Sequence, residues 1–266
     1  MQFLTVTFVH ALLVASALAL PSSTGEHLAK RADSFQRPSQ PVQLVKSPAG
    51  DSHGVAASNW AGVVLNSASG TYTFATGTFK VPTPSEPQNS WGTHAASAWV
   101  GIDGYDCASA VLQAGVALTV AAPSLTTYTA WYQWYPYTAV PVYDVPVHAN
   151  DVVRLSVNAT SPSAGVVTIE NLTTGKSAQH DVAGPELCQK SAEWVVEQYA
   201  VWGVPAPLAD FHTVAFTDAT ASGTNGTVAG PADDAAVVVN LVQNGKVVTK
   251  VMAGNDTVEI DYVNAN

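Results

Sequence analysis

Charged residues are scarce in this chain of 266 residues, and basic ones are scarcest. Ten lysines and arginines stand against twenty aspartates and glutamates, so the formal net charge at pH 7 is −10. Nucleic acids and anionic membranes are bound mainly through lysine and arginine, so we expect neither as a partner. Such an acidic chain suits conditions in which its carboxylates are partly protonated.

The short motifs of most hydrolase classes are also missing. There is no HExxH pair for zinc, no GxSxG nucleophile elbow, and no Asp-Thr-Gly or Asp-Ser-Gly. Neither of the two cysteines has the sequence context of a nucleophile, and the seven histidines show no metal-ligand spacing. These absences argue against metallo-, serine, cysteine and pepsin-like proteases, and we expect no metal and no cofactor.

The first residues have the features of a secretory signal peptide. Residues 1–19 form an apolar run that closes on Ala17-Leu18-Ala19, the small-x-small pattern cut by signal peptidase. No basic stop-transfer cluster follows, and no later stretch is apolar and long enough to span a bilayer. We therefore expect a secreted, extracellular protein without a membrane anchor.

Residues 20–55 are predicted to form a pro-segment or a linker, because they are rich in proline, serine and charge and show no periodicity. Lys30-Arg31 is a dibasic pair of the kind cut by processing proteases of the secretory pathway. Together with Arg37 and Lys46, this pair could hold the segment along an acidic groove until low pH weakens the attraction. A solvated linker without an inhibitory role is the equal alternative.

Residues 56–266 are predicted to be one all-β domain. Short runs rich in valine, threonine and aromatics are separated by turn residues, and helical periodicity is scarce. Val153, Leu155 and Val157 alternate with polar residues, and the turns at 173–176 and 243–246 are typical of hairpins. This length favours a single β-sandwich or barrel, which we expect to be a monomer.

The absence of residues 1–50 would make the remaining chain more acidic. That part holds four of the ten basic side chains and two of the twenty acidic ones, so the remainder has a net charge of about −12.

The only two cysteines, Cys107 and Cys188, are expected to pair in an oxidising secretory route. Their bond would close a loop of about 80 residues, worth about 4 kcal/mol in the chain-entropy model.

Aromatic and polar side chains gather on one face of three predicted strands, when alternate residues are assigned to opposite faces. The residues of this face are Trp99 and Asp103 in the first strand, Thr129, Trp131, Gln133 and Tyr135 in the second, and Glu193, Glu197 and Tyr199 in the third. Carboxylates are costly to bury without partners, so a concave, wet groove explains the pattern better than a dry core. An exposed face with scattered aromatics is the alternative.

Six segments in order resemble the signature of the eqolisins, a family of glutamic peptidases. They are residues 58–62 (SNWAG), 97–104 (SAWVGIDG), 111–115 (VLQAG), 131–136 (WYQWYP), 170–176 (ENLTTGK) and 192–197 (AEWVVE). The resemblance implies a sandwich of two curved antiparallel sheets of the concanavalin type, a cysteine pair placed as here, and a catalytic dyad of Gln113 and Glu197. The chain departs from well-known members at Thr129 and Gln133, where those carry acidic residues.

A glutamate and a glutamine can hydrolyse a peptide bond without a nucleophilic side chain. Glu197 would take a proton from water and return one to the leaving amine, while the Gln113 amide holds the water and stabilises the oxyanion. Because an unperturbed glutamate titrates near pH 4.3, we expect an acid pH optimum. The resemblance and the missing motifs imply protein or peptide substrates and insensitivity to pepstatin. Two alternatives stay open, namely a sandwich glycosidase and a non-catalytic module that binds sugar or peptide.

Two further sets of residues are candidates for binding and modification. The predicted substrate-binding residues of the groove are Trp60, Trp99, Asp103, Trp131, Gln133, Tyr135 and Tyr199. Four Asn-x-Thr sequons allow N-glycosylation, at Asn158, Asn171, Asn225 and Asn255.

Overall fold

The computed structural model describes residues 39–48, 54–121, 125–201, 204–226 and 228–264. Within these ranges the chain forms strands, turns and loops but no helix, so none of the described residues forms a helix that could cross a membrane. The predicted signal peptide, Lys30-Arg31 and Arg37 lie outside the described residues. The all-β prediction is confirmed.

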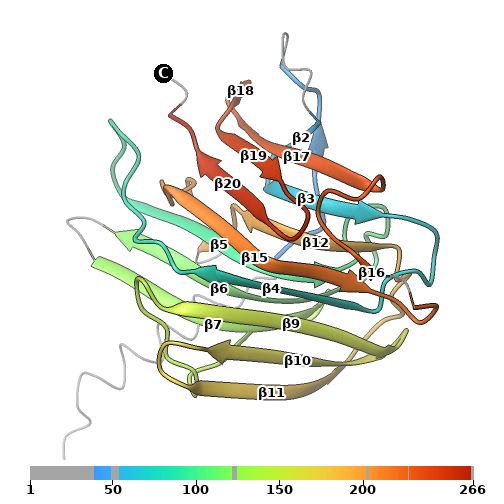
Figure 1. Ribbon diagram of the computed structural model, residues 1–266. Coiled ribbons are helices and arrows are strands. Elements are labelled where there is room, and N and C mark those ends of the chain that lie inside the picture. The colour runs from blue at the N-terminus through green and yellow to red at the C-terminus, as the bar shows by residue number, and fades with distance from the viewer. Residues whose placement is uncertain (1–38, 49–53, 122–124, 202–203, 227, 265–266) are drawn as a thin grey trace, which may run out of the picture.

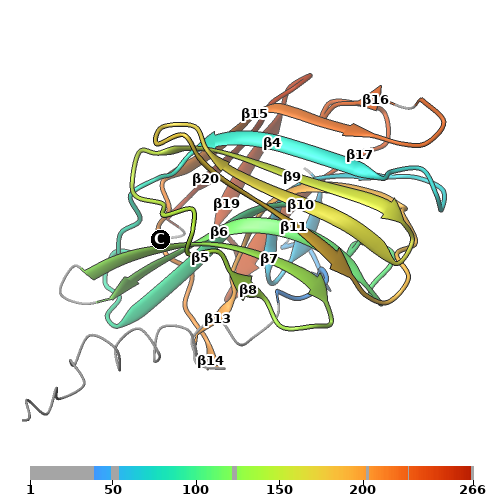
Figure 2. The ribbon, with the colours of Figure 1, turned by 90° about the horizontal axis from the view of Figure 1, so that it is seen from below.

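The strands form two large sheets stacked as a sandwich, with β4 and β9 over β5, β6 and β7 in Figure 2. The ten-stranded sheet contains, in spatial order, β1 (Leu44–Val45), β2 (Val55–Ala57), β17 (Ala236–Gln243), β3 (Trp60–Asn66), β12 (Ser191–Glu197), β5 (Thr93–Ile102), β6 (Val111–Ala121), β7 (Leu125–Tyr135) and β8 (Val140–Pro141), with β18 (Lys246–Val247) paired to β17. Its strands are antiparallel neighbours except for the parallel pair β2 and β17.

The second sheet has eight strands and faces the viewer in Figure 1. In spatial order it contains β11 (Lys176–Ala183), β10 (Ala164–Asn171), β9 (Val152–Ser161), β4 (Phe74–Lys80), β15 (Thr213–Ser222), β20 (Val258–Tyr262) and β19 (Thr249–Ala253), with β16 (Val228–Ala229) paired to β15. A separate short ladder joins β13 (Ala200–Val201) and β14 (Val204–Pro205).

Local sequence explains the strand pattern and the turns. Val153, Leu155 and Val157 of β9 are fully buried while the residues between them are not, as the period-two pattern predicted. The turn between β17 and β18 places Asn244 and Gly245 at φ of 50° and 73°, a left-handed pair that Asn-Gly adopts readily. At the turn between β10 and β11, Gly175 also has a positive φ, of 70°.

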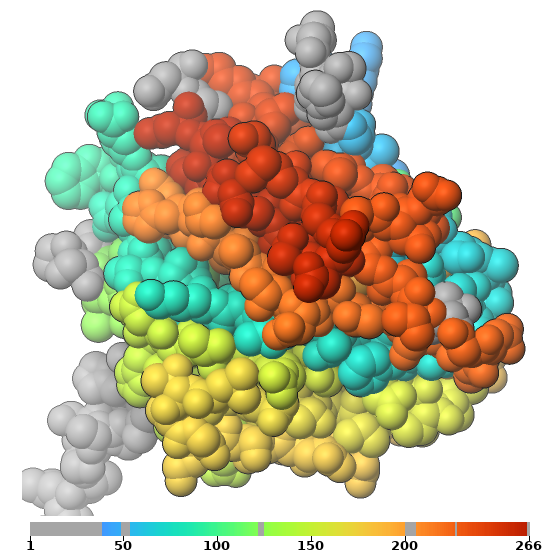
Figure 3. All heavy atoms as spheres, viewed as in Figure 1, coloured from blue at the N-terminus to red at the C-terminus, as the bar shows by residue number. Residues whose placement is uncertain are grey.

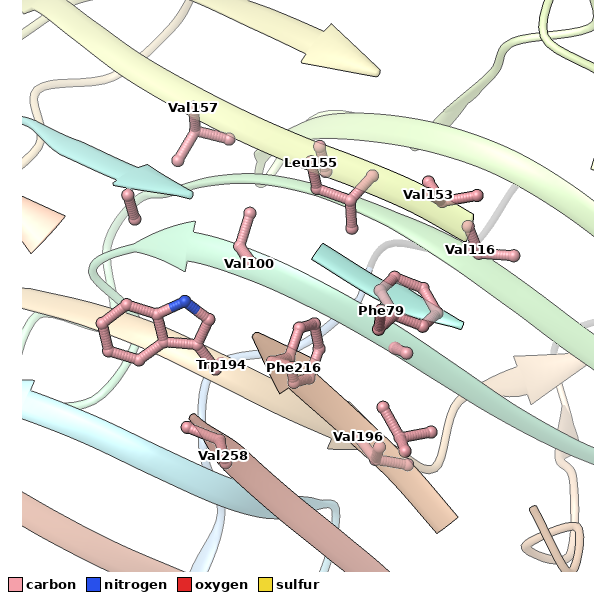
Figure 4. Close-up of a cluster of buried hydrophobic side chains, with 14 of the residues drawn as sticks. Phe79, Val100, Val116, Val153, Leu155, Val157, Trp194, Val196, Phe216 and Val258 are labelled. Atoms are coloured by element: carbon pink, nitrogen blue, oxygen red, sulfur yellow. The ribbon is translucent and has the colours of Figure 1, made fainter. Parts of the chain in front are cut away.

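The main hydrophobic core lies between the two sheets (Figure 4). Phe79 and Phe216 of the eight-stranded sheet pack with ring centroids 5.1 Å apart. Trp194 and Val196 of β12 enter the core from the other sheet, and the Trp194 indole donates a hydrogen bond to the Thr76 carbonyl at 2.7 Å. This core holds β12 from one side and leaves its other side chains for the outer face of the ten-stranded sheet.

The two outer faces differ in composition. Along β11, on the surface seen in Figure 3, exposed residues alternate with partly buried ones. The outer face of the ten-stranded sheet instead carries a second buried cluster, centred on Trp60, Trp99 and Trp131. A strand covered on both sides is expensive to build with polar groups, so the polar residues within this second cluster are the candidates for function.

Candidate active site

β12 brings two carboxyl groups into the second cluster. All seven of its residues are buried, and Glu193, Val195 and Glu197 alternate with the core residues Trp194 and Val196. Glu193 is 0% exposed and Glu197 is 1% exposed. Carboxyl groups are rarely buried so deeply without partners, so the contacts of each decide what it can do.

Three donors surround the Glu197 carboxyl. The Trp99 indole donates to Oε2 at 3.0 Å, the backbone N–H of Gln40 donates to Oε1 at 3.0 Å, and the Ser39 hydroxyl bonds to Oε2. Burial raises the pKa of Glu197 to about 7, and these hydrogen bonds act in the opposite direction. A carboxyl held by donors in this way can take up and give back a proton.

Two indoles form the wall beside Glu197. Trp60 lies opposite Glu197 in the β3–β12 register and packs edge to face on Trp99, with ring centroids 4.8 Å apart and planes at 78°. The Trp60 indole donates to the Gln40 carbonyl at 3.0 Å. Both rings therefore combine an apolar surface with a satisfied polar tip.

Gln113 lies on the same face, two strands from β12. The register joins Glu193 to Gly101, Gly101 to Gln113 and Gln113 to Gln133 in one row across β12, β5, β6 and β7. Glu197 belongs to a parallel row two side-chain positions further along its strand. No direct bond between Gln113 and Glu197 is present, so a bound group would have to bridge them.

Between these two rows the sheet is shaped by a glycine. Gly115 lies opposite Trp99 on one side and Trp131 on the other. A Cβ atom at Gly115 would lie 2.7 Å from Trp131 Cζ2 and from Trp99 Cβ. Any residue with a side chain at position 115 would therefore displace Trp99 and Trp131 from the face between Gln113 and Glu197.

The Gln113 amide is held by a second glutamine. Its Nε2 donates to Gln133 Oε1 at 3.0 Å, and Gln133 Nε2 donates to the Tyr137 carbonyl at 2.7 Å. Gln113 and Gln133 are each 1% exposed. Gln113 Oε1 is buried and has no hydrogen-bond partner among the described residues, so it is an acceptor available to a ligand.

Three other predicted groove residues also belong to this face. The Trp131 indole donates to the Ser97 hydroxyl at 3.0 Å, and the Tyr199 hydroxyl bonds to the Thr119 hydroxyl at 2.8 Å. Burial raises the pKa of Tyr199 to about 12, so this phenol stays neutral at acid and neutral pH. Tyr135 is half-buried at the end of β7.

Residues 39–43 cover this face, which is therefore not the open groove expected from the sequence. Ser39 is buried and touches Glu197, and the next residues are tied to the sheet by backbone groups: Val42 N–H donates to the Gly104 carbonyl at 3.0 Å, and Gln43 N–H donates to Asn59 Oδ1 at 2.8 Å. The Asn59 amide in turn donates to the Pro41 carbonyl at 3.0 Å. No signal in the sequence pointed to Ser39 and Gln40, because the proline- and serine-rich segment around them shows no periodic pattern.

The family of this chain follows from comparison with known proteins. A model described as the peptidase A4 family matches residues 58–262, which include every strand of the site. The chain belongs to the peptidase A4 family. This confirms the resemblance to the eqolisins, and it removes the sandwich glycosidase and the non-catalytic module considered from the sequence.

Curated relatives agree with this assignment. The chain is 39% identical to aspergillopepsin-2 of Aspergillus niger over 77% of this chain and 78% of that protein. It is 31% identical to scytalidopepsin B of Scytalidium lignicola over 99% of this chain and the whole of that protein.

Solved structures of the family share the fold. Scytalido-glutamic peptidase with a transition state analog inhibitor matches with a TM-score of 0.68 and 30% identity, over 77% of this chain and 98% of that chain. Aspergilloglutamic peptidase from Aspergillus niger matches with a TM-score of 0.60 and 40% identity, over 64% of this chain and 99% of that chain. The sandwich of two sheets is thus the architecture of glutamic peptidases.

Asp103 has a different place in this A4 peptidase from the one predicted. It follows the end of β5 with a φ of 68°, is 0% exposed, and accepts backbone N–H groups of Gln189 at 2.7 Å and Lys190 at 2.8 Å. Burial raises the pKa of Asp103, and these N–H donors act in the opposite direction. Asp103 therefore anchors the start of β12, because the chain turns at Asp103 where the strand was expected to continue. A contact between Asp103 and substrate stays a prediction.

The disulfide of this peptidase lies next to that anchor. Cys107 and Cys188 are bonded, with Cα atoms 6.1 Å apart, as the sequence predicted. Cys188 directly precedes Gln189, whose N–H binds Asp103. The bond and the carboxylate together fix the loop after β5 to the segment that leads into β12.

The four sequons differ in access. Asn158, Asn225 and Asn255 are exposed, so they stay candidates for glycosylation. Asn171 is 0% exposed, and its Nδ2 donates to the Pro146 carbonyl and to Asp151. The folded A4 domain offers no room for a glycan on Asn171, because this amide is used to build the turn after β10.

The departures at Thr129 and Gln133 have separate consequences. Thr129 lies in the row of Glu197, opposite Ala117, and is half-buried. Gln133 is the hydrogen-bond partner of Gln113.

Among the described residues, no group of three or more His, Cys, Asp or Glu side chains is arranged to hold a metal ion.

Proposed function

We propose that this A4 peptidase is a secreted acid endopeptidase whose catalytic pair is Glu197 and Gln113. The observation that carries the proposal is the environment of Glu197, a buried carboxyl that shares its sheet face with Gln113 and whose pKa burial raises to about 7 while residues 39–43 cover it. Departure of that segment readmits water to the carboxyl and so removes the desolvation that is the main cause of the raised pKa. Gln113 supplies on that face a buried acceptor oxygen that has no hydrogen-bond partner in the described part of the chain. Such perturbed carboxyl groups with nearby polar groups are typical of catalytic sites.

The proposed reaction uses water as the nucleophile. The Glu197 carboxylate takes one proton from water as the water oxygen attacks the peptide carbonyl, and Gln113 Oε1 accepts a hydrogen bond from the other O–H, whose proton stays on the tetrahedral intermediate and then on the new carboxyl group. The tetrahedral oxyanion accepts a hydrogen bond from Gln113 Nε2. Glu197, now protonated, gives its proton to the leaving amine, and the C–N bond breaks, so the pair returns to its first state.

The peptide substrate class is supported by the relatives. One family structure carries a tripeptide, Ala-Ile-His, and another a peptide-based transition state analog. Here the face offers indoles for side-chain contact, Trp60, Trp99 and Trp131, once residues 39–43 have left it. Backbone-to-side-chain hydrogen bonds already hold residues 40–43 there, which supports a site for extended peptides.

We also propose that residues 39–43 keep the precursor inactive. The Ser39 hydroxyl and the Gln40 N–H donate hydrogen bonds to the Glu197 carboxyl and occupy the place where the attacking water would have to lie. Of the four basic residues expected to hold this segment by charge, Lys46 alone lies within the described residues, and it is exposed. Charge attraction therefore stays a prediction, while the hydrogen bonds to Glu197 and the burial of its carboxyl under the segment support the inhibitory role.

The proposal is tested by casein digestion at pH 3 with protein trimmed before residue 54. We expect activity that is insensitive to pepstatin, and a loss of about 100-fold or more in kcat for Gln113→Ala, as for other oxyanion donors. The untrimmed protein at the same concentration should be less active. Near wild-type turnover of Gln113→Ala would refute the dyad, whereas equal activity of trimmed and untrimmed protein would refute only the inhibitory role of residues 39–43.

A further inference from the structure

Gln113 and Gln133 form a hydrogen-bonded chain that ends on the protein backbone. They face each other in register on β6 and β7. Gln113 Nε2 donates to Gln133 Oε1, and Gln133 Nε2 donates to the Tyr137 carbonyl. The Tyr137 N–H donates to the Trp134 carbonyl at 2.9 Å, so this peptide segment is itself tied to the end of β7.

The donors and acceptors of this hydrogen-bonded chain can be arranged in only one way. A peptide carbonyl can only accept a hydrogen bond, so Gln133 must turn its NH₂ group toward Tyr137. Its oxygen then faces Gln113 and can only accept, so Gln113 must turn its own NH₂ group toward Gln133. Rotating either amide by half a turn would set two donors or two acceptors against each other in a buried place, which is costly.

The fixed polarity decides what Gln113 offers to a substrate. One N–H of Nε2 is used on Gln133, which leaves the other N–H as a donor and Oε1 as an acceptor to which no described residue bonds. The proposed reaction needs one donor for the oxyanion and one acceptor for the water. Without Gln133 the Gln113 amide could turn over and exchange these two functions.

We propose that Gln133 is a positioning residue for catalysis, which transmits the polarity of the Tyr137 carbonyl to the Gln113 amide. This inference rests on the proposed function of Gln113. It replaces the direct substrate contact expected for Gln133 from the sequence, since Gln133 is buried and both of its amide groups are engaged by protein.

An amide at this position has a property that a carboxyl lacks. It presents a donor on one side and an acceptor on the other at every pH. A glutamic acid can reproduce the two bonds only while it is protonated, because a carboxylate would direct two acceptors at Tyr137 and Gln113. A leucine of similar size can reproduce neither bond.

The test compares Gln133→Leu and Gln133→Glu in trimmed protein, by kcat and KM on one peptide at pH 3. We expect Gln133→Leu to lose about 10- to 100-fold in kcat with KM changed less, as for a misplaced catalytic group. Gln133→Glu, protonated at this pH, should stay within about threefold of wild type, because it restores the chain. Gln179→Leu makes the same chemical change at an exposed position of β11 and serves as the control, with unchanged kinetics.

A double-mutant cycle separates positioning from a merely structural role. If Gln133 acts through Gln113, adding Gln133→Leu to Gln113→Ala should cause no further loss in kcat. A further loss equal to that of the single variant would overturn the inference, and so would wild-type kcat for Gln133→Leu or equal losses for the Leu and Glu variants. Full activity of Gln113→Ala would instead refute the proposed function itself.

Discussion

The two ends of β12 carry the same residue in different surroundings. Glu193 and Glu197 share one face of the strand, and both are shielded from solvent. Glu197 receives hydrogen bonds from three residues, whereas neither oxygen of Glu193 has a hydrogen-bond partner among the described residues. Burial raises the pKa of Glu193 well above its ordinary value; the nearby Ser191 hydroxyl acts in the opposite direction, and the charge of Asp103 adds to the rise.

This comparison shows that burial alone does not make a carboxyl catalytic. A carboxyl without donors stays protonated and behaves as a neutral polar group in the packing. A carboxyl with donors and with a face that a ligand can reach can ionise and return its proton within one cycle. We therefore expect Glu193 to affect stability and Glu197 to affect turnover.

The largest expected effect is on activity, when each glutamate is replaced by glutamine in trimmed protein. Glu197→Gln should lower kcat by about 10²- to 10⁴-fold, because the water loses its base. Glu193→Gln, its matched control four positions away, should stay near wild-type kcat because glutamine mimics the neutral carboxyl. Steady-state kinetics on one peptide at pH 3 to 5 measures both, and equal losses in the two variants would erase the distinction.

Removal of the disulfide should destabilise the protein where the chain enters the Glu193 end of β12. In Cys107→Ser combined with Cys188→Ser, the closed loop of 81 residues is opened, and the chain-entropy model predicts a loss of about 4 kcal/mol in the free energy of unfolding. Urea unfolding at pH 4 measures this. A loss below about 1 kcal/mol would mean that Asp103 and the sheet hold the loop after β5 without the bond.

The pH dependence of stability should report Glu193. A group whose pKa is raised by folding stabilises the protein fully below its unfolded pKa, near 4.3, and loses that contribution as the pH rises toward its folded pKa. Wild-type protein should therefore lose stability as the pH rises from about 4 upward, by up to about 1.4 kcal/mol per pH unit for this group. Glu193→Gln should remove this part of the slope.

Urea unfolding of wild type and Glu193→Gln across that pH range provides the measurement. The two proteins should differ little at pH 3 and diverge as the pH rises, with the variant the more stable. Parallel curves would show that Glu193 binds the same number of protons in the folded and unfolded states. Glu193 would then be ionised in the folded protein above about pH 4.3, which would contradict the buried neutral state.

The smallest expected effect concerns the donor that Ser39 gives to Glu197. A peptide of residues 32–48 should inhibit trimmed protein, and its Ser39→Ala form should bind about fivefold more weakly, for a lost bond worth about 1 kcal/mol. The Lys46→Ala form is the control and should bind as the natural peptide does, because Lys46 is exposed. Inhibition constants at pH 4 decide this, and a larger loss for Lys46→Ala would favour charge attraction over the hydrogen bond.

The sequence by itself determined the strands, their faces and several turns. Alternation over a few residues is a local property, so Val153 to Val157 and the Asn244-Gly245 turn could be predicted, and the two cysteines allowed only one intramolecular pair. The same alternation placed Trp131 and Gln133 on one face, and the six segments pointed to the family. The candidate site was thereby predicted as a set of residues but not as a set of contacts.

Only the tertiary structure decided which of those residues meet. Gln113 and Gln133 bond because β6 and β7 pair in one register out of several that the sequence would allow. Ser39 reaches Glu197 across a separation of 158 residues, and Asp103 turns back to the start of β12. Such contacts depend on which strands become neighbours and where each one ends, and these follow from the packing of the whole sandwich rather than from any local pattern.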